Sequence, residues 1–463
     1  MDLDIDTPAE PLLPSTGRAL LHRIAVAQAE DRAPSLVAAV VRDGHPVWTG
    51  SRSCVEGHTP DPDTQYRIGS ITKTFVAVLV MRLRDEGLLR LSDRLDQHLT
   101  GLAEDAGAAT VGQLLSHTSG LTSEPPGPWW ERTPGTLRPG LADVLQQPAT
   151  RHPAGRVHHY SNVGFALLGA LVEQLRGEPW TEVLRREALE PLGLTRTTPL
   201  PQHPHAGGWA VHPWADVLLP EPTEDTGRMA PAGQLWSTVG DLCRWAVFLA
   251  DGDDRVLAPA TLAEMRERES PEADGQSHGL GLALLRAHGL SYAGHTGSMP
   301  GFLAAVWVVP GERLAAVALA NTTSITGGGI GALVADLLRI TAEHEPRLPE
   351  PWRPLPAVDP ELLALTGTWY WGPAAFTLRL KADRALELGR VGNGSGAVRL
   401  RPEADGTWTA LDDYWQGETL RVVRGADGDV SHLDLGTFVL TREPYPVAGP
   451  VPGGVDPDGW KAL

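Results

Sequence analysis

The sequence predicts a protein of the α+β class, with helices and β-hairpins through most of the chain and a small antiparallel β domain near its end. Apolar residues recur at helical spacing over residues 17–31 and 74–83. Residues 35–41 and 47–49 are apolar runs on either side of an Asp-Gly turn, which is typical of a β-hairpin. Near the C-terminus, short strand-like segments separated by turns predict a barrel-like or sandwich domain. These segments are residues 367–371, 376–380, 398–401, 408–411, 420–423 and 438–440.

The composition is that of a globular protein, because 42% of the 463 residues are hydrophobic, which is enough for two or three domains. The net charge of -18 argues against nucleic acid or an anionic membrane surface as a partner, since no basic segment interrupts the acidic background. Residues 1–6 lack the basic and apolar regions of a secretory signal, and no apolar run approaches the ~20 residues that cross a bilayer. We therefore expect a cytoplasmic protein without a membrane partner. Cys54 and Cys243 are too few and too far apart for a disulfide framework, and we expect both to be buried thiols.

A candidate nucleophile stands at the start of an apolar helix. Ser70 and Lys73 are three residues apart, so a helix places both side chains on one face. A serine hydroxyl is a weak nucleophile and needs an adjacent base, and a lysine can be that base when burial and the helix N-terminus lower its pKa. The same helix start offers free backbone N–H groups for an oxyanion. Ser-x-x-Lys alone also occurs by chance, as an N-cap serine followed by a surface lysine.

Two further polar motifs precede regular structure. Tyr160-Ser161-Asn162 leads into the apolar helix that begins at Val163, and by itself such a triplet is often only a helix cap. His295-Thr296-Gly297 comes shortly before two apolar runs, 303–309 and 314–320, which predict a second hairpin.

Other histidines have simpler interpretations. Residues 111–121 predict a short helix that ends at Gly120, and we expect His117 to cap this helix end, an interpretation favoured over a catalytic role. Three more histidines lie in the loop-like segment 201–225, namely His203, His205 and His212. Their spacing matches no zinc motif, so we predict no metal site and no other cofactor.

Together the motifs resemble a known family. In order and approximate spacing, Ser70-Ile71-Thr72-Lys73, Tyr160-Ser161-Asn162 and His295-Thr296-Gly297 match the three motifs of the serine β-lactamase and D-Ala-D-Ala carboxypeptidase superfamily. Segments 114–121, 191–194 and 279–281 are also similar to that superfamily. The resemblance covers roughly residues 15–340. It implies an antiparallel sheet with flanking helices beside a helical subdomain, with the active site in the cleft between them.

The resemblance and the composition together predict the domain boundaries. We expect a β-lactamase/DD-peptidase-like catalytic domain over residues 1–343 and a proline-rich linker over residues 344–360. A small antiparallel β domain is predicted for residues 361–446, and a tail rich in proline and glycine for residues 447–463.

The resemblance also implies roles for the motif residues. Ser70 would be the nucleophile and Lys73 its base. Tyr160 would carry protons to and from the leaving group. Asn162 would hydrogen-bond substrate amides and position Lys73. The three motifs thus imply acyl transfer to serine and then to water or an amine.

The third motif would bind the substrate backbone. The strand containing His295, Thr296 and Gly297 would pair with the substrate, and the N–H groups of Ser70 and Ser298 would hold the oxyanion. Histidine at position 295 replaces the lysine that is commoner in this motif, which weakens recognition of a free carboxylate.

Aromatic residues suggest the kind of substrate. Trp129 and Trp130 lie in a loop over residues 124–139 that is rich in proline and glycine. With three other tryptophans they would suit a hydrophobic peptide and help to exclude water. The set is Trp129, Trp130, Trp209, Trp214 and Trp236.

The overall arrangement resembles the penicillin-binding-protein-type thioesterases. That resemblance implies a peptide presented on a carrier protein and released by head-to-tail macrocyclisation at a D-residue C-terminus. The alternatives are a cytoplasmic esterase, D-peptidase, DD-carboxypeptidase or β-lactamase-type hydrolase, and a catalytically silent binding protein. The intact motifs argue against the silent protein. The sequence leaves the oligomeric state, the peptide and the ring size open.

Overall fold

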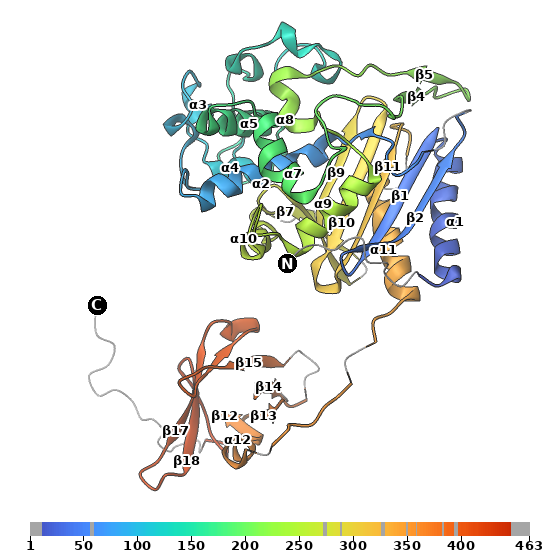
Figure 1. Ribbon diagram of the computed structural model, residues 1–463. Helices are drawn as coiled ribbons and strands as arrows, with labels where there is room; N and C mark the ends of the chain where they lie inside the picture. Colours follow the sequence, from blue (N-terminus) through green and yellow to red (C-terminus); the bar gives the residue numbers. More distant parts are fainter. Residues whose placement is uncertain are drawn as a thin grey trace. The chain divides into compact units, whose positions relative to one another are not determined.

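A computed structural model describes residues 12–55, 60–271, 276–287, 289–325, 329–348, 351–357, 359–381, 384–392 and 397–445 (Figure 1). Backbone contacts divide the chain into two units, Met1–Arg347 and Leu348–Leu463. Each unit has a hydrophobic core of its own. The tail predicted over residues 447–463 lies outside the described residues.

The first unit is built on a seven-stranded antiparallel sheet with strand order β2-β1-β11-β10-β9-β8-β7. Its strands are β1 (Ser35–Arg42), β2 (His45–Ser53), β7 (Gln276–His278), β8 (Ala283–Ala287), β9 (Leu290–Met299), β10 (Phe302–Val309) and β11 (Leu314–Ala320). Both predicted hairpins are present. In the first, Asp43 and Gly44 have φ angles of 54° and 87°. A two-residue type I′ turn requires positive φ at both central positions, which explains the Asp-Gly pair.

Helices cover both faces of this sheet (Figure 1). α1 (Pro14–Glu30) and α11 (Gly329–His344) share one core with the sheet, and α9 (Val239–Asp251) packs on the opposite face. β1 contributes side chains to both cores, because alternate side chains of a strand point to opposite faces of the sheet. Leu36 lies in the core with α1 and α11, whereas Val37 lies in the core with α9.

A helical region of the first unit surrounds the buried helix α2 (Thr72–Asp85). α2 contacts α5 (Asn162–Arg176) and α8 (Ala230–Gly233). Most of its side chains are buried, as expected for a helix that is apolar on all sides. α5 begins after the N-cap Ser161 and ends at Gly177, whose φ of 73° is the left-handed conformation common at helix ends.

The remaining elements of the first unit are short. The helices are α3 (Glu104–Gly107), α4 (Val111–Leu115), α6 (Trp180–Leu184), α7 (Glu190–Leu192) and α10 (Pro259–Met265). β3 (Tyr66–Arg67) pairs with β6 (Trp236–Ser237), and β4 (Trp209–Val211) pairs with β5 (Leu218–Pro220). Two predictions were therefore wrong in detail. The helix predicted to reach Gly120 ends at Leu115, and the segment 201–225 contains the β4–β5 hairpin.

The second unit is an eight-stranded antiparallel sheet in simple sequence order, preceded by α12 (Pro360–Leu365). Its strands are β12 (Gly367–Trp371), β13 (Ala374–Leu380), β14 (Leu386–Arg390), β15 (Val398–Pro402), β16 (Trp408–Ala410), β17 (Thr419–Arg424), β18 (Val430–Leu435) and β19 (Phe438–Leu440). Tyr370 beside Thr441 links the first strand to the end of the last, so the sheet is nearly closed into a barrel. β14 and β18 were not predicted, because charged and polar residues interrupt their apolar pattern.

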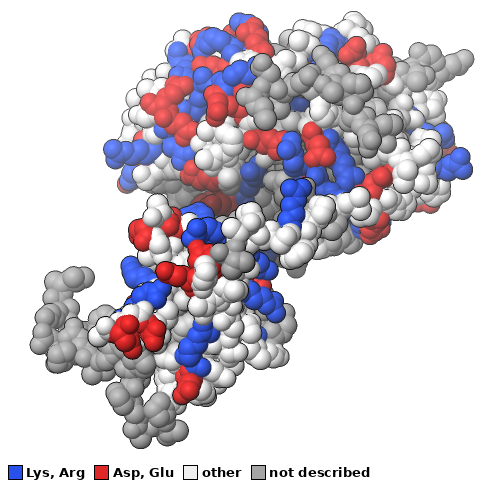
Figure 2. Space-filling view, turned by 60° about the horizontal axis from the view of Figure 1, so that its bottom comes forward, with Lys and Arg blue, Asp and Glu red and all other residues white. Residues whose placement is uncertain are grey.

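Some surface properties follow from the same structure. Cys243 is buried as predicted, but Cys54 is exposed at the end of β2, so that prediction was wrong. On the face shown in Figure 2, Lys and Arg side chains lie among Asp and Glu side chains. No helix among the described residues is both long and apolar enough to cross a membrane.

Candidate active site

Ser70 lies in a 3-10 turn, Gly69–Ile71, that leads directly into α2. The two-residue pairing of β3 with β6 anchors the chain just before this turn. Ser70 is only half-buried, whereas Lys73, one turn further on, has no exposed surface. The local fold therefore presents the hydroxyl at a surface and holds the amine beneath it.

Lys73 is held directly against the nucleophile. Its Nζ donates hydrogen bonds to Ser70 Oγ at 2.8 Å and to the carbonyl of Ala232 at 2.6 Å. Burial lowers the pKa of Lys73 to about 7, although the negative charges of Glu124 and Glu131 act in the opposite direction. A substantial fraction of Lys73 is then neutral near pH 7 and can take the proton of Ser70.

The side chain of Tyr160 lies beside the Lys73 amine. Lys73 Nζ lies 5.0 Å from the centre of the Tyr160 ring. Burial raises the pKa of Tyr160, and a hydrogen bond with Ser70 offsets only part of this effect. The phenol therefore stays protonated near neutral pH, where it can donate a proton to a leaving group.

Asn162 and Glu124 form a second polar pair. Asn162 is the first residue of α5, and its Nδ2 donates to Glu124 Oε1 at 2.7 Å. Glu124 Oε2 accepts a hydrogen bond from Trp130 Nε1, also at 2.7 Å. Asn162 Oδ1 is buried and has no hydrogen-bond partner among the described residues, so it is free to accept a substrate N–H. Among the described residues, Lys73 donates to Ser70 and Ala232, whereas the Asn162 amide nitrogen donates to Glu124.

The third motif passes very close to the nucleophile. Gly69 has a φ of 53°, and a Cβ there would lie 2.5 Å from Ser298 N. A Cβ at Gly297 would lie 1.9 Å from the carbonyl oxygen of Ile68 and 3.0 Å from Ser70 N. Only glycine at both positions allows β9 to lie against the Ser70 turn. The backbone nitrogens of Ser70 and Ser298, the two predicted oxyanion donors, both belong to this junction.

The end of β9 also offers a strand edge. β8 pairs with β9 only as far as Gly294, whereas β10 pairs with it as far as Met299. Among the described strands, residues 295–299 thus have a ladder partner on one side only. Thr296 and Ser298 are exposed. An edge of this kind can bind an extended peptide through backbone hydrogen bonds.

Three histidines, His117, His278 and His295, meet beside these residues. The His117 ring packs against the Tyr160 ring with 4.2 Å between ring centres, and the His278 ring lies 5.0 Å from His117. Burial is the main cause that lowers the pKa of His278 to about 2, of His295 to about 4, and of His117 well below its usual range. All three are neutral at physiological pH.

His117 caps the end of α4 as predicted, because its backbone has the left-handed conformation of a helix C-terminal cap and its N–H donates to the carbonyl of Leu114 at 3.3 Å. α4 ends at Leu115, and His117 follows it with a φ of 56°. Its Nδ1 accepts a hydrogen bond from Ser161 N at 3.1 Å. The side chain thus supports the Tyr160 motif from behind.

The predicted tryptophans occupy different environments. Trp130 is largely buried and bonded to Glu124, and Trp129 is 58% exposed. Trp236 is buried in the core, where its ring packs against Phe302, so its side chain is not at the cleft surface. Trp209 is half-buried, and Trp214 is 90% exposed.

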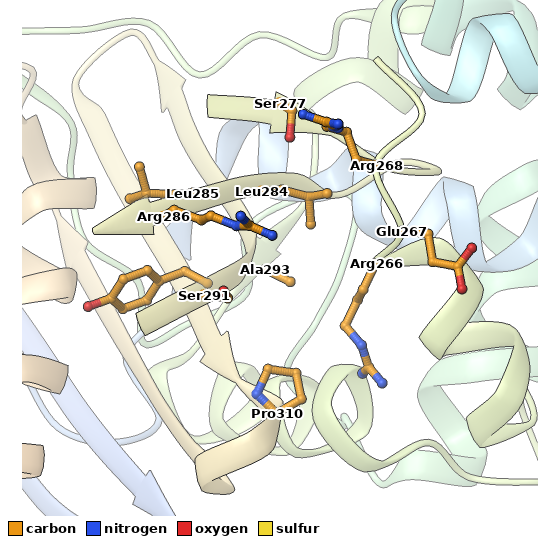
Figure 3. Close-up of a pocket in the computed structure, with 11 residues that line it drawn as sticks. Arg266, Glu267, Arg268, Ser277, Leu284, Leu285, Arg286, Ser291, Ala293 and Pro310 are labelled. Carbon is orange, nitrogen blue, oxygen red and sulfur yellow. The ribbon is translucent and has the colours of Figure 1, made fainter. Parts of the chain in front are cut away.

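A pocket of about 570 Å³ lies between β7–β9 and the segment after α10 (Figure 3). Arg266, Arg268 and Arg286 are among its lining residues, and Figure 3 shows Arg286 extending from β8 into it. Neither Ser70 nor the residues around it line this pocket, so it is not the site of acylation.

Several groups at the site were not predicted. The carbonyl of Ala232 has no sequence signal, because any residue offers a backbone oxygen. Glu124 and Glu131 lie in the same predicted loop as Trp129 and Trp130, and carboxylates within a predicted substrate loop are a signal that could have indicated them. His278 lies next to the segment 279–281, which already resembled the superfamily.

The geometry supports one kind of chemistry. Ser70 can attack a carbonyl carbon while its proton passes to Lys73, and Tyr160 can protonate the group that leaves. Backbone N–H groups at the junction with β9 lie where an oxyanion would form. A nucleophilic serine with a lysine base, between an antiparallel sheet and a helical region, defines the class of active-site serine acyl-transfer enzymes.

Comparison with known proteins identifies the family. The family model described as Beta-lactamase matches residues 21–342, which is most of the chain. The chain is 31% identical over 385 residues to Penicillin-binding protein 4 of Amycolatopsis lactamdurans, covering 75% of this chain and 96% of that protein. This chain therefore belongs to the beta-lactamase family, within the serine β-lactamase/DD-peptidase superfamily, and the predicted fold class is confirmed.

Solved structures agree with this assignment. A crystal structure of SurE covers 93% of this chain and 99% of its own, with a TM-score of 0.57 and 25% identity. A D-stereospecific amidohydrolase from Streptomyces sp. covers 73% of this chain and 100% of its own, with a TM-score of 0.54 and 26% identity. A second family model, described as a domain of unknown function (DUF7586), matches residues 358–442.

Proposed function

We propose that this protein is a cytoplasmic serine acyltransferase that takes a peptidyl group from a carrier-bound thioester and releases it by head-to-tail cyclisation at a D-residue C-terminus. The observation that carries the acyl-transfer step is the contact of 2.8 Å between Lys73 Nζ and Ser70 Oγ, beside the free edge of β9. An extended peptide along that edge would bring its C-terminal carbonyl to Ser70.

The proposed reaction has two steps, acylation of Ser70 and ring closure. Ser70 Oγ attacks the thioester carbonyl, its proton moves to Lys73, and the thiol leaves after taking a proton through Tyr160. The N-terminal amine of the same peptide then gives a proton to neutral Lys73 and attacks the acyl-serine carbonyl; the amide forms, the bond from the carbonyl to Ser70 Oγ breaks, and Ser70 Oγ takes that proton back. Glu124 and Glu131 place negative charge at the site, which favours approach of a cationic peptide terminus.

The preference for a D-residue rests on similarity. The Streptomyces sp. protein that is 26% identical to this chain is a D-stereospecific amidohydrolase. Asn162 Oδ1, which is buried and has no hydrogen-bond partner in the described part of the chain, offers one polar contact that would fix the orientation of the last residue.

Hydrolysis is the second candidate. Ser70 is half-buried and Glu124 is exposed, so water can reach the acyl-serine. The same site would then release a linear acid, as an esterase, D-peptidase, DD-carboxypeptidase or β-lactamase-type enzyme does.

The deciding experiment offers matched peptidyl thioesters that end in a D-residue or in its L-enantiomer. Products are separated by mass, because a cyclic product is 18 Da lighter than the linear acid from the same peptide. Cyclic product from the D-substrate alone supports the proposal. Linear acid alone favours the hydrolase, and equal turnover of both enantiomers would refute the stereochemical part.

A further inference from the structure

The three histidines beside the nucleophile come from distant parts of the sequence. His117 follows α4, His278 ends β7, and His295 lies in β9. One ring nitrogen from each lies within 4.8 Å of those of the other two. The mechanism derived above uses no proton transfer by any of them.

Two of these rings have a buried nitrogen that no hydrogen bond in the described structure uses. His295 Nδ1 pairs with the carbonyl of Thr296 at 2.5 Å, so Nδ1 carries the proton and Nε2 does not. Among the described residues, neither His295 Nε2 nor His278 Nε2 has a hydrogen-bond partner, although both atoms are buried. Buried nitrogens of this kind are normally paired, and their convergence calls for a ligand.

The donor set indicates which ligand fits. Neutral imidazole nitrogens suit zinc, copper and nickel ions, whereas magnesium and calcium prefer oxygen. A Zn²⁺ ion about 2.0–2.1 Å from each nitrogen would bring them to about 3.4 Å of one another, so each side chain must move by less than about 1 Å. The bond from His295 to a backbone carbonyl is the outer contact that commonly orients a metal-binding histidine.

His117 differs from the other two. Because its Nδ1 accepts a hydrogen bond from Ser161 N, its Nε2 carries the proton in the neutral ring. A metal ion must displace that proton to bind there. His278 and His295 are therefore the stronger ligands.

We propose that His278 and His295, with His117 as a third ligand, bind a divalent transition-metal ion such as Zn²⁺, and that the bound ion blocks acylation of Ser70. The Tyr160 ring centre lies 5.0 Å from Lys73 Nζ, 4.2 Å from the His117 ring and 6.0 Å from the His295 ring, so the ion would lie close to the catalytic base. An ion at this point would occupy space next to the β9 edge where substrate is expected. Zinc would then switch the enzyme off reversibly.

The test uses the full-length chain without a histidine tag. Calorimetric titration with ZnCl₂ should show one ion per chain, and His278→Gln should weaken binding at least about tenfold. His278→Cys, which supplies another zinc ligand, should restore it. The matched control is the double change His203→Gln and His205→Gln, a pair of rings 4.6 Å apart outside the site, which should bind zinc as the wild type does.

A second readout follows the rate at which a fluorophosphonate labels Ser70. Zinc should slow labelling of the wild type, EDTA should restore it, and His278→Gln should be insensitive to zinc. Thermal unfolding without metal checks that each variant folds. No zinc binding by the wild type, undiminished binding by His278→Gln, or loss of binding only in the control pair would overturn the proposal. None of these outcomes depends on whether the natural product is cyclic or linear.

Discussion

At the scale of single residues, the ionisation of Lys73 should control acylation. Its pKa is lowered to about 7, while the pKa values of the three neighbouring histidines lie far below and that of Tyr160 lies above its usual value. Only neutral Lys73 can accept the proton of Ser70, so the acylation rate should rise with pH and level off above about pH 7.

Glu124 gives a direct check on this assignment. Its negative charge raises the pKa of Lys73, so Glu124→Gln should lower that pKa and move the rising limb of the pH profile to lower pH. Glu182→Gln, an exposed carboxylate on α6, is the matched control and should leave the limb in place. The measurement is the pH dependence of single-turnover acylation. If the rising part of the pH profile does not move in Glu124→Gln, the group that controls acylation is not Lys73.

At the scale of elements, the close approach of β9 to the Ser70 turn should be indispensable. Gly297→Ala places a Cβ 1.9 Å from the carbonyl oxygen of Ile68, so β9 must move away. We expect a loss of about 1–3 kcal/mol in the free energy of unfolding and about a hundredfold slower acylation, because the oxyanion donors separate.

Gly311→Ala is the matched control for this change. Gly311 lies in the turn between β10 and β11, and a Cβ there would meet no atom within 4 Å. In denaturant unfolding and in acylation kinetics, Gly311→Ala should therefore behave like the wild type, whereas Gly297→Ala should be less stable and slower. Equal behaviour would show that the junction tolerates a side chain.

The same elements show how far the sequence could predict the structure. The hairpins and α5 were predictable because turn residues and caps, such as the Asp-Gly pair and Ser161, act locally. The order of the three motifs indicated the family. Sequence patterns could not show that Ala232 supplies a carbonyl to Lys73, or that Trp236 is buried against Phe302. Those contacts join segments far apart in the chain, and apolar aromatic residues suit a core as well as a cleft.

At the scale of the whole molecule, the two units should be separable. Backbone contacts divide the chain after Arg347, and every candidate catalytic residue lies before that point. A chain ending at residue 347 should fold and should label Ser70 with a fluorophosphonate within about threefold of the full-length rate, because such a small probe needs only the first unit. The release of a carrier-bound peptide can be measured in the same two proteins, the chain ending at residue 347 and the full-length chain. Loss of fluorophosphonate labelling on truncation would show that the second unit contributes to the site.

The central claim is that Ser70 forms the acyl-enzyme, and mass spectrometry of the acylated protein and of its proteolytic peptides tests it most directly. The wild type and Ser70→Ala are each mixed with a peptidyl thioester ending in a D-residue, quenched in acid and digested. We predict one added acyl group in the wild type, located on the peptide that contains Ser70, and none in Ser70→Ala, which should unfold at the same temperature. An adduct on another residue, or turnover that survives in Ser70→Ala, would contradict the account.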